Sequence, residues 1–499
     1  MKREAKTTNW RERASTLQPR TEAFIDGKYQ PAASGETFVC INPATGKSIA
    51  QVAACGSRDV ETAVTSARRA FEDGRWSRMA PASRKKVLLR FSELMRKHRE
   101  ELALTETLDM GKPISDSLMI DIPGAARCIA WYAEAIDKVY DEIAPTPHDT
   151  LALITREPVG VVGAIVPWNF PLLMACWKLG PALATGNSVV LKPSEKSPLT
   201  ALRIAELAVE AGLPEGVFNV VPGFGHTAGE SLALHMDVDC IAFTGSTRIG
   251  RRMLEYAGRS NMKRVWLECG GKSPNIVMSD VADIERAARA AAIGIFFNQG
   301  EMCSAASRLL VHESIREEML DKIVAIGEAM APGDPLDPAT KLGAIVDQAQ
   351  MNTVLGYIES GRKGGANLRS GGKRVREESG GFFVEPTVFD GVQMDMRIAR
   401  EEVFGPVLSA ISFKSLDEAV KMANDVMYGL AAAVWTRNLT TAHRVDKSIR
   451  AGTVYVNCYD GDDITVPFGG FKQSGNGRDK SLHAMHKYTE LKTTWIDLS

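Results

Sequence analysis

Cys303 is the residue of this sequence best placed for nucleophilic chemistry. It lies in FFNQGEMCSAASR (296–308), three residues after an Asn-Gln-Gly break that ends an apolar run. A cysteine attacks as its thiolate, and a turn or a helix N-terminus can favour that form. We therefore expect the break to favour the thiolate, and Glu301 to oppose it if its carboxylate points inward. The alternative is that Cys303 is a small buried hydrophobe like most of the eight cysteines.

Two further residues have the chemistry that such a nucleophile needs nearby. Glu268 ends the strand-like run KRVWLE and precedes two glycines. Partial burial there raises the pKa of a carboxyl group and suits a general base. Asn169 lies between the two prolines of PWNFP (167–171), and a fixed carboxamide can donate to a developing oxyanion. The alternatives are a salt-bridged or helix-capping glutamate and an asparagine that bonds within its own turn.

The elements that must position these residues alternate between strand and helix. From residue 159 the strand-like runs VGVVGAIV, SVVLK, VFNVV, CIAFTG and KRVWLE are separated by amphipathic helical stretches. A second alternating series extends from about residue 284 to 470 and has Cys303 near its start. This alternation predicts an α/β protein with two doubly wound parallel-sheet domains. Such sheets bind ligands beyond the carboxyl ends of their strands, where the loops WNFP, KPSE, PGFG and TGST fall.

Two of these loops carry signals for a nucleotide. Lys192 and Glu195, in KPSE, can both bond a ribose, and a carboxylate at its 2′-hydroxyl favours NAD over NADP. FTGSTRIG (243–250) predicts a helix N-terminus that can hold a diphosphate. PGFGHTAG is a weak glycine signal, and the alternative for each segment is an ordinary turn between strand and helix.

Composition narrows the class of protein. The 499 residues are 44% apolar and 24% charged with a formal net charge of −1, which gives no reason to expect nucleic acid or an anionic membrane as partner. The apolar segment 159–177 contains two prolines and an asparagine at its centre, so we interpret it as buried strand, turn and helix. The polar N-terminus has no apolar core of a secretory signal, and we expect a cytoplasmic protein. No cysteine pair has zinc spacing, and His483 and His486 alone are too few ligands for a metal site, so we expect no metal. Disulfides are not expected in the cytoplasm.

In order and spacing, VPWNFP, KPSE, FTGST, LECGGKSPNIV, FFNQGEMC, EEVFGPV and PFGGFKQSGNGRD resemble the aldehyde dehydrogenase superfamily from about residue 20 to 499. The resemblance implies NAD-dependent oxidation of an aldehyde to its acid through a Cys303 thiohemiacetal and thioester, with NADP as a further cofactor. It assigns Cys303 as nucleophile, Glu268 as general base and Asn169 as oxyanion donor. The residues that it implies for the cofactor are Trp168, Lys192, Glu195, Gly225, Gly245, Ser246, Glu402 and Phe404.

The resemblance also implies a division of the chain. The NAD-binding domain would comprise 1–137 and 159–270, the catalytic domain 271–475, and a small β oligomerisation arm 138–158 and 476–499. From the sequence itself, 138–158 reads as a hairpin and TELKTTWIDL at the C-terminus as an edge strand. An isolated hairpin is marginal in water, so we expect both to pair with something, such as another subunit. The expected assembly is a homotetramer built as a dimer of dimers, or a homodimer.

Segments such as DIPGAAR, EAIDKVYDE and PLDPAT are similar to bacterial γ-glutamyl-γ-aminobutyraldehyde and 4-guanidinobutyraldehyde dehydrogenases of polyamine and arginine catabolism. Some relatives instead act on indole-3-acetaldehyde. We expect an ω-amino, γ-glutamylamino or ω-guanidino butyraldehyde, with a broad or aromatic aldehyde specificity as the alternative. The residues expected to line the substrate channel are Phe170, Met174, Trp177, Met302, Ser304, Tyr459 and Asp460.

The acidic loop NCYDGDD (457–463) bears on this choice. Asp460, Asp462 and Asp463 lie close together in sequence, and like charges so close are unfavourable unless they are solvated or meet a cation. We interpret the loop as a seat for an ammonium or guanidinium tail, the alternative being a solvated acidic turn. Three rival classes remain: a CoA-acylating dehydrogenase, which needs no base at 268; a cofactor-free cysteine hydrolase; and an inactive binding protein of dehydrogenase fold.

Overall fold

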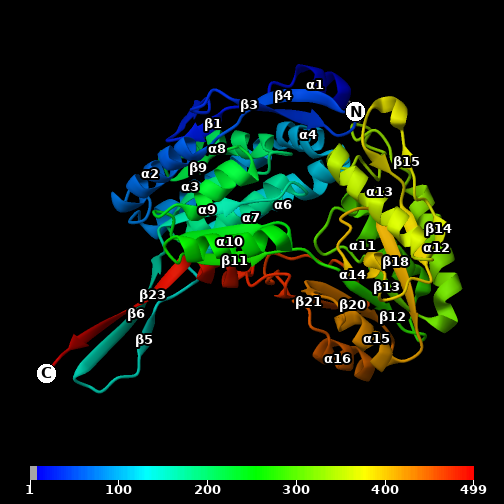
Figure 1. Ribbon diagram of the computed structural model, residues 1–499. Helices are drawn as coiled ribbons and strands as arrows, with labels where there is room; N and C mark the ends of the chain where they lie inside the picture. The colour runs from blue at the N-terminus through cyan, green and yellow to red at the C-terminus, as the bar shows by residue number, and fades with distance from the viewer. Residues whose placement is uncertain (1–7) are drawn as a thin grey trace, which may run out of the picture.

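A computed structural model describes residues 8–499 and contains two seven-stranded sheets and a projecting three-stranded arm (Figure 1). The first sheet has the strand order β11-β10-β7-β8-β9-β1-β2, and its five strands from β7 to β11 are parallel. Strands β1 and β2 extend it antiparallel at one edge. Its strands are β1 (Ala23–Ile25), β2 (Lys28–Gln30), β7 (Val161–Ile165), β8 (Ser188–Lys192), β9 (Phe218–Val220), β10 (Cys240–Thr244) and β11 (Arg264–Glu268).

Helices cover both faces of the first sheet. One hydrophobic core contains side chains of α3, α4, α6, α7 and α8, and another contains side chains of α2, α9 and α10. Because β7, β8 and β10 are buried along their whole length, their sequences are runs of apolar or small residues, apart from Lys192 at the end of β8. The helices are α2 (Ser57–Glu72), α3 (Pro81–Lys97), α4 (Arg99–Met110), α6 (Ile122–Ala135), α7 (Pro171–Ala184), α8 (Leu199–Glu210), α9 (Glu230–Leu234) and α10 (Thr247–Arg259).

The second sheet has the strand order β14-β17-β18-β13-β12-β20-β21 and is parallel except for the edge strand β14. Its strands are β12 (Pro274–Val277), β13 (Arg308–His312), β14 (Asn367–Ser370), β17 (Thr387–Asp390), β18 (Val407–Phe413), β20 (Ala431–Trp435) and β21 (Thr453–Val456). One hydrophobic cluster of this part contains side chains of α13, α14, α15 and α16, and the other contains side chains of α11 and α12. The helices are α11 (Ile284–Phe296), α12 (Arg316–Ala329), α13 (Gln348–Lys363), α14 (Arg397–Arg400), α15 (Leu416–Asn424) and α16 (Leu439–Ser448). The predicted class, α/β with two doubly wound parallel sheets, is confirmed.

The arm is a sheet of three antiparallel strands that projects from the first sheet's side of the molecule (Figure 1). β5 (Glu142–Ala144) and β6 (Thr150–Pro158) form the hairpin, and β23 (Thr489–Asp497) pairs with β6 along nine residues. The expected hairpin and C-terminal strand therefore pair with each other. Residues Ala484, Met485 and Tyr488, which precede β23, pack into the core of the first sheet and anchor the arm.

The remaining elements are short. The short helices are α1 (Trp10–Thr16) and α5 (Ile114–Asp116), with the π-helical turns η1 (Ser117–Asp121) and η2 (Gly225–Gly229). The 3-10 turns are η3 (Phe297–Gly300), η4 (Glu313–Ile315), η5 (Glu377–Ser379) and η6 (Leu482–Tyr488). Three antiparallel strand pairs complete the structure: β3 (Thr37–Asn42) with β4 (Lys47–Ala53), β15 (Arg374–Val375) with β16 (Phe383–Val384), and β19 (Tyr428–Gly429) with β22 (Phe471–Lys472). Within residues 8–499, no helix has the length and apolar character needed to cross a membrane.

Candidate active site

Cys303 follows an unusual turn between α11 and β13. Asn298, Gln299 and Gly300 have consecutive positive φ angles of 49°, 58° and 71°. A Cβ on Gly300 would lie 2.2 Å from the carbonyl oxygen of Gly405, so only glycine fits there. Three residues after the end of this turn, the half-buried Cys303 lies on the wall of a cavity.

Hydrogen bonds from buried side chains hold this turn. Asn298 Nδ2 donates to the carbonyl oxygens of Asn169 (3.1 Å) and Glu301 (3.2 Å). The Glu301 carboxylate points into the protein, where Oε1 accepts from the backbone N–H of Val346 at 3.1 Å. Asn298 was not predicted from the sequence as a positioning residue, although an Asn shortly before a Gly is a recognisable signal for left-handed backbone.

The electrostatic surroundings of Cys303 differ from what the turn suggested. Burial, and then the carboxylates of Glu402, Glu268 and Asp460, raise the pKa of the Cys303 thiol above its ordinary value. The expectation that the turn favours the thiolate is therefore wrong for the protein without ligands, because burial and these carboxylates outweigh the backbone N–H near the sulfur. Glu301 is not among the groups that raise this pKa.

Asn169 lies between β7 and α7 and lines the same cavity as Cys303. Its Nδ2 donates to the carbonyl oxygen of Glu301 at 2.8 Å. A carboxamide nitrogen has two hydrogens, so a second one remains for a ligand in the cavity. The residue is only 4% exposed, and the hydrogen bond to Glu301 fixes the direction of its side chain.

Glu268 ends β11 and is fully enclosed. Both carboxylate oxygens are buried without a hydrogen-bond partner among the described residues. A Cβ on Gly469 or on Gly477 would lie 2.8 Å from Oε1, so these two glycines make room for the carboxyl group. Burial, and then the charge of Asp479, raise the pKa of Glu268 well above its ordinary value. Glu268 does not line the cavity, and Asp479 is itself ion-paired with the buried Lys178 and Lys487.

Several predicted cofactor residues lie at the carboxyl ends of the first sheet's strands. Lys192 Nζ is 3.1 Å from Glu195 Oε2 just after β8. Ser246 caps α10, accepting from the N–H of Ile249 at 3.4 Å, and Gly245 donates its N–H to the Glu268 carbonyl. The open first turn of a 13-residue helix together with a Lys–Glu pair is a donor and acceptor set that fits a dinucleotide.

Glu402 and Phe404 approach this region from the second sheet. Glu402 Oε1 accepts from the Gly271 N–H at 3.0 Å, and burial raises the pKa of its carboxyl group to about 7. A Cβ on Gly270 would lie 2.0 Å from Glu402 Oε2, so the glycine permits this close approach. Phe404, with φ of 55°, packs edge-on against Trp168 with ring centroids 5.1 Å apart.

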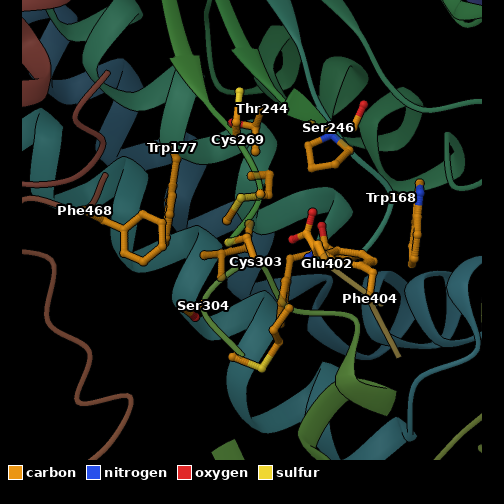
Figure 2. A pocket seen from close by; sticks show the side chains of 18 of the residues that line it. Trp168, Trp177, Thr244, Ser246, Cys269, Cys303, Ser304, Glu402, Phe404 and Phe468 are labelled. Atoms are coloured by element: carbon orange, nitrogen blue, oxygen red, sulfur yellow. The ribbon is translucent and has the colours of Figure 1, made fainter. Parts of the chain in front are cut away.

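One cavity of about 330 Å³ joins these parts. Figure 2 shows Cys303 near Glu402, with Trp168 and Phe404 on one side and Trp177 and Phe468 on the other. The predicted residues that line the cavity are Trp168, Asn169, Phe170, Met174, Trp177, Gly245, Ser246, Met302, Cys303, Ser304, Glu402, Phe404 and Asp460. Asp462, which the acidic-loop interpretation included, also lines it. Lining residues that were not predicted from the sequence are Ile120, Pro167, Leu173, Thr244, Cys269, Gly270, Phe297, Gln350, Tyr455 and Phe468.

Five predicted site residues lie outside the lining of this cavity: Lys192, Glu195, Gly225, Glu268 and Tyr459. Gly225 is exposed at the start of η2. Tyr459 was expected as a channel wall, but its hydroxyl donates to the carbonyl oxygen of Ser304 at 2.6 Å. That bond joins the side chain to the loop that contains Cys303.

The three aspartates of the acidic loop have different partners. Asp463 Oδ1 accepts from the N–H and hydroxyl of Thr465. Asp462 forms an ion pair with Lys480. Asp460 has no cationic partner among the described residues, and its only close polar contact there is the Ser304 hydroxyl at 3.5 Å. Asp460 is exposed as a residue, but desolvation of its carboxyl group, and then the neighbouring Asp462, raise its pKa to about 6 against the opposing charge of Lys480.

Known proteins of similar sequence and structure share this architecture. Residues 29–494 match the aldehyde dehydrogenase family. The NADP/NAD-dependent aldehyde dehydrogenase PuuC of Escherichia coli K12 is 55% identical over 489 residues, which are 98% of each chain. The crystal structure of γ-glutamyl-γ-aminobutyraldehyde dehydrogenase from Burkholderia cenocepacia J2315 is 62% identical with a TM-score of 0.97, covering 98% of this chain and 99% of that one. An indole-3-acetaldehyde dehydrogenase complexed with NAD+ is 64% identical, also with a TM-score of 0.97 and the same coverage.

These matches extend over nearly the whole chain, beyond the motifs that first suggested them. The chain belongs to the aldehyde dehydrogenase family, whose chemistry is the oxidation of an aldehyde with NAD or NADP.

Proposed function

We propose that this aldehyde dehydrogenase oxidises a four-carbon aldehyde with a cationic or polar tail, namely an ω-amino, γ-glutamylamino or ω-guanidino butyraldehyde. The observation that carries the proposal is the Asp460 carboxylate, which lines the cavity without a cation of its own among the described residues. With a pKa of about 6 it is ionised at neutral pH and can attract an ammonium or guanidinium group. The aromatic and apolar lining around Phe170 and Met174 suits the methylene chain.

In the reaction we propose, the Cys303 sulfur bonds to the aldehyde carbon while its proton leaves for a neighbouring base or water. The free Nδ2 hydrogen of Asn169 donates to the oxyanion that forms. When bound, NAD would accept the hydride that this carbon loses, which would leave a thioester on Cys303. Glu268 takes a proton from water as the water oxygen bonds to the thioester carbon. The C–S bond then breaks and this proton passes to the departing sulfur, which releases the acid and restores the thiol. Since the carboxyl group of Glu268 lies against Gly469 and Gly477 and not on the cavity wall, it must turn toward the thioester to do so.

We propose that this chain holds NAD through the predicted set. Lys192 and Glu195 would bond the adenosine ribose, Gly245 and Ser246 the diphosphate, and Glu402 with Phe404 the nicotinamide ribose. Glu195 is 34% exposed and paired with Lys192, so it can move aside, which supports tolerance of the additional phosphate of NADP. Loss of intrinsic fluorescence on titration with each dinucleotide measures both affinities, and Glu195→Gln should narrow the difference between them.

The substrate proposal is tested by comparing kcat/KM for 4-guanidinobutyraldehyde and hexanal, followed by NADH absorbance. In Asp460→Asn the preference for the guanidino substrate should fall about fivefold, which is the change in binding expected when one partly exposed charge pair is lost. Asp463→Asn is the matched control, because its carboxylate is bound to Thr465 and should leave the preference unchanged. Equal preference for both aldehydes in both wild type and Asp460→Asn would remove the proposal.

A second candidate is a broad or aromatic specificity that includes indole-3-acetaldehyde. The aromatic pair Trp177 and Phe468, with centroids 5.3 Å apart on the cavity wall, favours it, as does the similarity to the indole-3-acetaldehyde dehydrogenase. Adding indole-3-acetaldehyde to the same panel decides between them, since a wild-type kcat/KM for it that equals or exceeds the value for 4-guanidinobutyraldehyde would favour this second candidate.

We further propose that the arm joins copies of this chain into a homotetramer or a homodimer in the cytoplasm. Tyr140, Ile143 and Trp495 on the arm are 76%, 71% and 65% exposed, an unusual amount of large apolar surface. All eight cysteines are free, which suits a reducing compartment. Light scattering after size exclusion gives the assembly size, and Trp495→Glu should reduce it.

A further inference from the structure

Behind the aromatic wall of the cavity lies a buried ammonium group. Lys480, just before η6, has a side chain only 4% exposed and forms an ion pair with Asp462. Its Nζ lies 5.5 Å from the ring centroid of Trp177 and 5.7 Å from that of Phe468. The two rings and Asp462 line the cavity, while Lys480 does not. Lys480 therefore touches the wall from outside and reaches the cavity only through these neighbours.

The ion pair changes the charge that a substrate meets at the acidic loop. Asp460 and Asp462 both line the cavity, and together they would present two negative charges. Lys480 forms an ion pair with Asp462, and its charge also lowers the pKa of Asp460, so these two aspartates and Lys480 together carry about one negative charge. The Asp462 side chain is 56% exposed, whereas the Lys480 side chain is only 4% exposed and its ammonium group is held in place by this ion pair.

The aromatic contacts limit where a cationic tail can bind. The faces of Trp177 and Phe468 already have the Lys480 ammonium group within cation–π distance. A second cation against the same rings would be repelled by Lys480. This leaves the Asp460 carboxylate as the favourable position for a cationic tail, and the rings as an apolar wall for uncharged ones.

We propose that Lys480 is a positioning residue that sets the charge selectivity of the aldehyde site by masking Asp462. The inference rests on the proposed function, in which the loop discriminates between charged and neutral aldehydes. With Lys480 in place the site holds a cationic tail at a single carboxylate and still admits neutral aldehydes. Without it, the site would attract cations more strongly and repel anionic aldehydes.

A double-mutant cycle over Lys480 and Asp462 tests this, using Lys480→Met, Asp462→Asn and the pair of substitutions together. The measured quantity is the ratio of kcat/KM for 4-guanidinobutyraldehyde to that for hexanal, with succinic semialdehyde as the anionic substrate. Lys480→Met should raise the cation-to-neutral ratio about three- to fivefold and lower the use of succinic semialdehyde by a similar factor. Asp462→Asn should shift both in the opposite direction, and the double variant should return close to wild type.

Lys480→Arg is the conservative control, since it retains the charge and should keep the wild-type ratio. A purely structural role for Lys480 would lower kcat/KM for all three substrates together and leave the ratios unchanged, and that result would overturn the proposal. Should Lys480→Met fail to fold, Asp462→Asn still tests the proposal, because this substitution is at an exposed position. An unchanged ratio of kcat/KM values in Asp462→Asn would also overturn the proposal. Failure of the proposed function is seen separately, as an unchanged ratio in Asp460→Asn while the Lys480 variants shift theirs.

Discussion

Replacement of Asn169 by alanine tests the proposed oxyanion contact separately from the structural role of this residue. Asn169 Nδ2 donates to the Glu301 carbonyl at 2.8 Å, and Asn298 Nδ2 donates to the same oxygen at 3.2 Å. Because the second donor remains in Asn169→Ala, that carbonyl is not left without a partner. We expect the free energy of unfolding to fall by only about 1 kcal/mol.

The catalytic effect should be much larger than the effect on stability. The second Nδ2 hydrogen of Asn169 is the one that the oxyanion on the Cys303 adduct would accept. Loss of one such donor lowers kcat about 100- to 1000-fold, equivalent to about 2.7–4 kcal/mol of transition-state stabilisation. The hydrolysis of p-nitrophenyl acetate passes through a similar oxyanion without any cofactor, so it should slow by a comparable factor.

Alkylation of Cys303 by iodoacetamide is the discriminating assay. No oxyanion forms in alkylation, and Asn169 is not among the groups that shift the Cys303 pKa, so the rate in Asn169→Ala should stay within about twofold of wild type. Asn298→Ala is the matched control. It removes two hydrogen bonds that hold the Cys303 turn, so it should lower stability and disturb alkylation. Equal losses of alkylation and turnover in Asn169→Ala would refute the assignment of Asn169 as oxyanion donor.

Three further outcomes follow from the geometry. The Glu402 carboxylate raises the pKa of Cys303, so Glu402→Gln should lower that pKa and speed alkylation about three- to tenfold. The comparison is made at about pH 8, because Glu402, with a pKa of about 7, is ionised there. Gly477→Ala places a Cβ 2.8 Å from Oε1 of Glu268, so thioester hydrolysis should slow by about tenfold to a hundredfold and a pre-steady-state burst of NADH should appear. Gly300→Ala combines a φ of 71° with a clash against backbone and should lower stability by at least about 2 kcal/mol, measured as the midpoint of thermal unfolding.

A different result would contradict each of these three predictions. Alkylation of Glu402→Gln that is as slow as in wild type at every pH would remove the electrostatic account of the thiol. Unchanged kcat without a burst in Gly477→Ala would show that Glu268 is not displaced or is not the base. Gly356→Ala, inside α13 with no atom near its Cβ, controls for Gly300→Ala and should leave the unfolding midpoint unchanged or raise it.

The parallel sheets could be predicted from sequence because their strands are buried on both faces. A strand such as β8 is buried at all five positions, and its sequence SVVLK stands out between two helical patterns. The edge strands were not recognised for the opposite reason. β1 is three residues long, and its neighbour β2 is partly exposed, so neither leaves a periodic signal. The hairpin of β3 leaves no such signal either, because β3 alternates in burial while its exposed Val39 and Ile41 are as apolar as its buried Phe38 and Cys40.

The site could be predicted in its residue types but not in its charges. Motif spacing led to Cys303 and Asn169, and the structure brings both to one cavity. The groups that decide the charges around them lie far away along the chain. Glu402 is 99 residues beyond Cys303 in sequence, and Lys480 neutralises Asp462 from a segment that the sequence placed in the arm. Charge compensation between distant segments leaves no pattern in a single sequence.

Cys303 and Asn169 come from different sheets, yet they form one unit. Asn169 belongs to the loop after β7 of the first sheet, whereas Cys303 precedes β13 of the second. Two hydrogen bonds cross between the loops, from Asn169 to Glu301 and from Asn298 to Asn169, and a third joins Asn298 to Glu301 within the turn. A movement of one sheet against the other would have to break the two crossing bonds, and buried groups left without such bonds are unfavourable. The nucleophile and its proposed oxyanion donor are therefore aligned before any ligand binds, and what remains for ligands to change is the protonation of the thiol and the direction of Glu268.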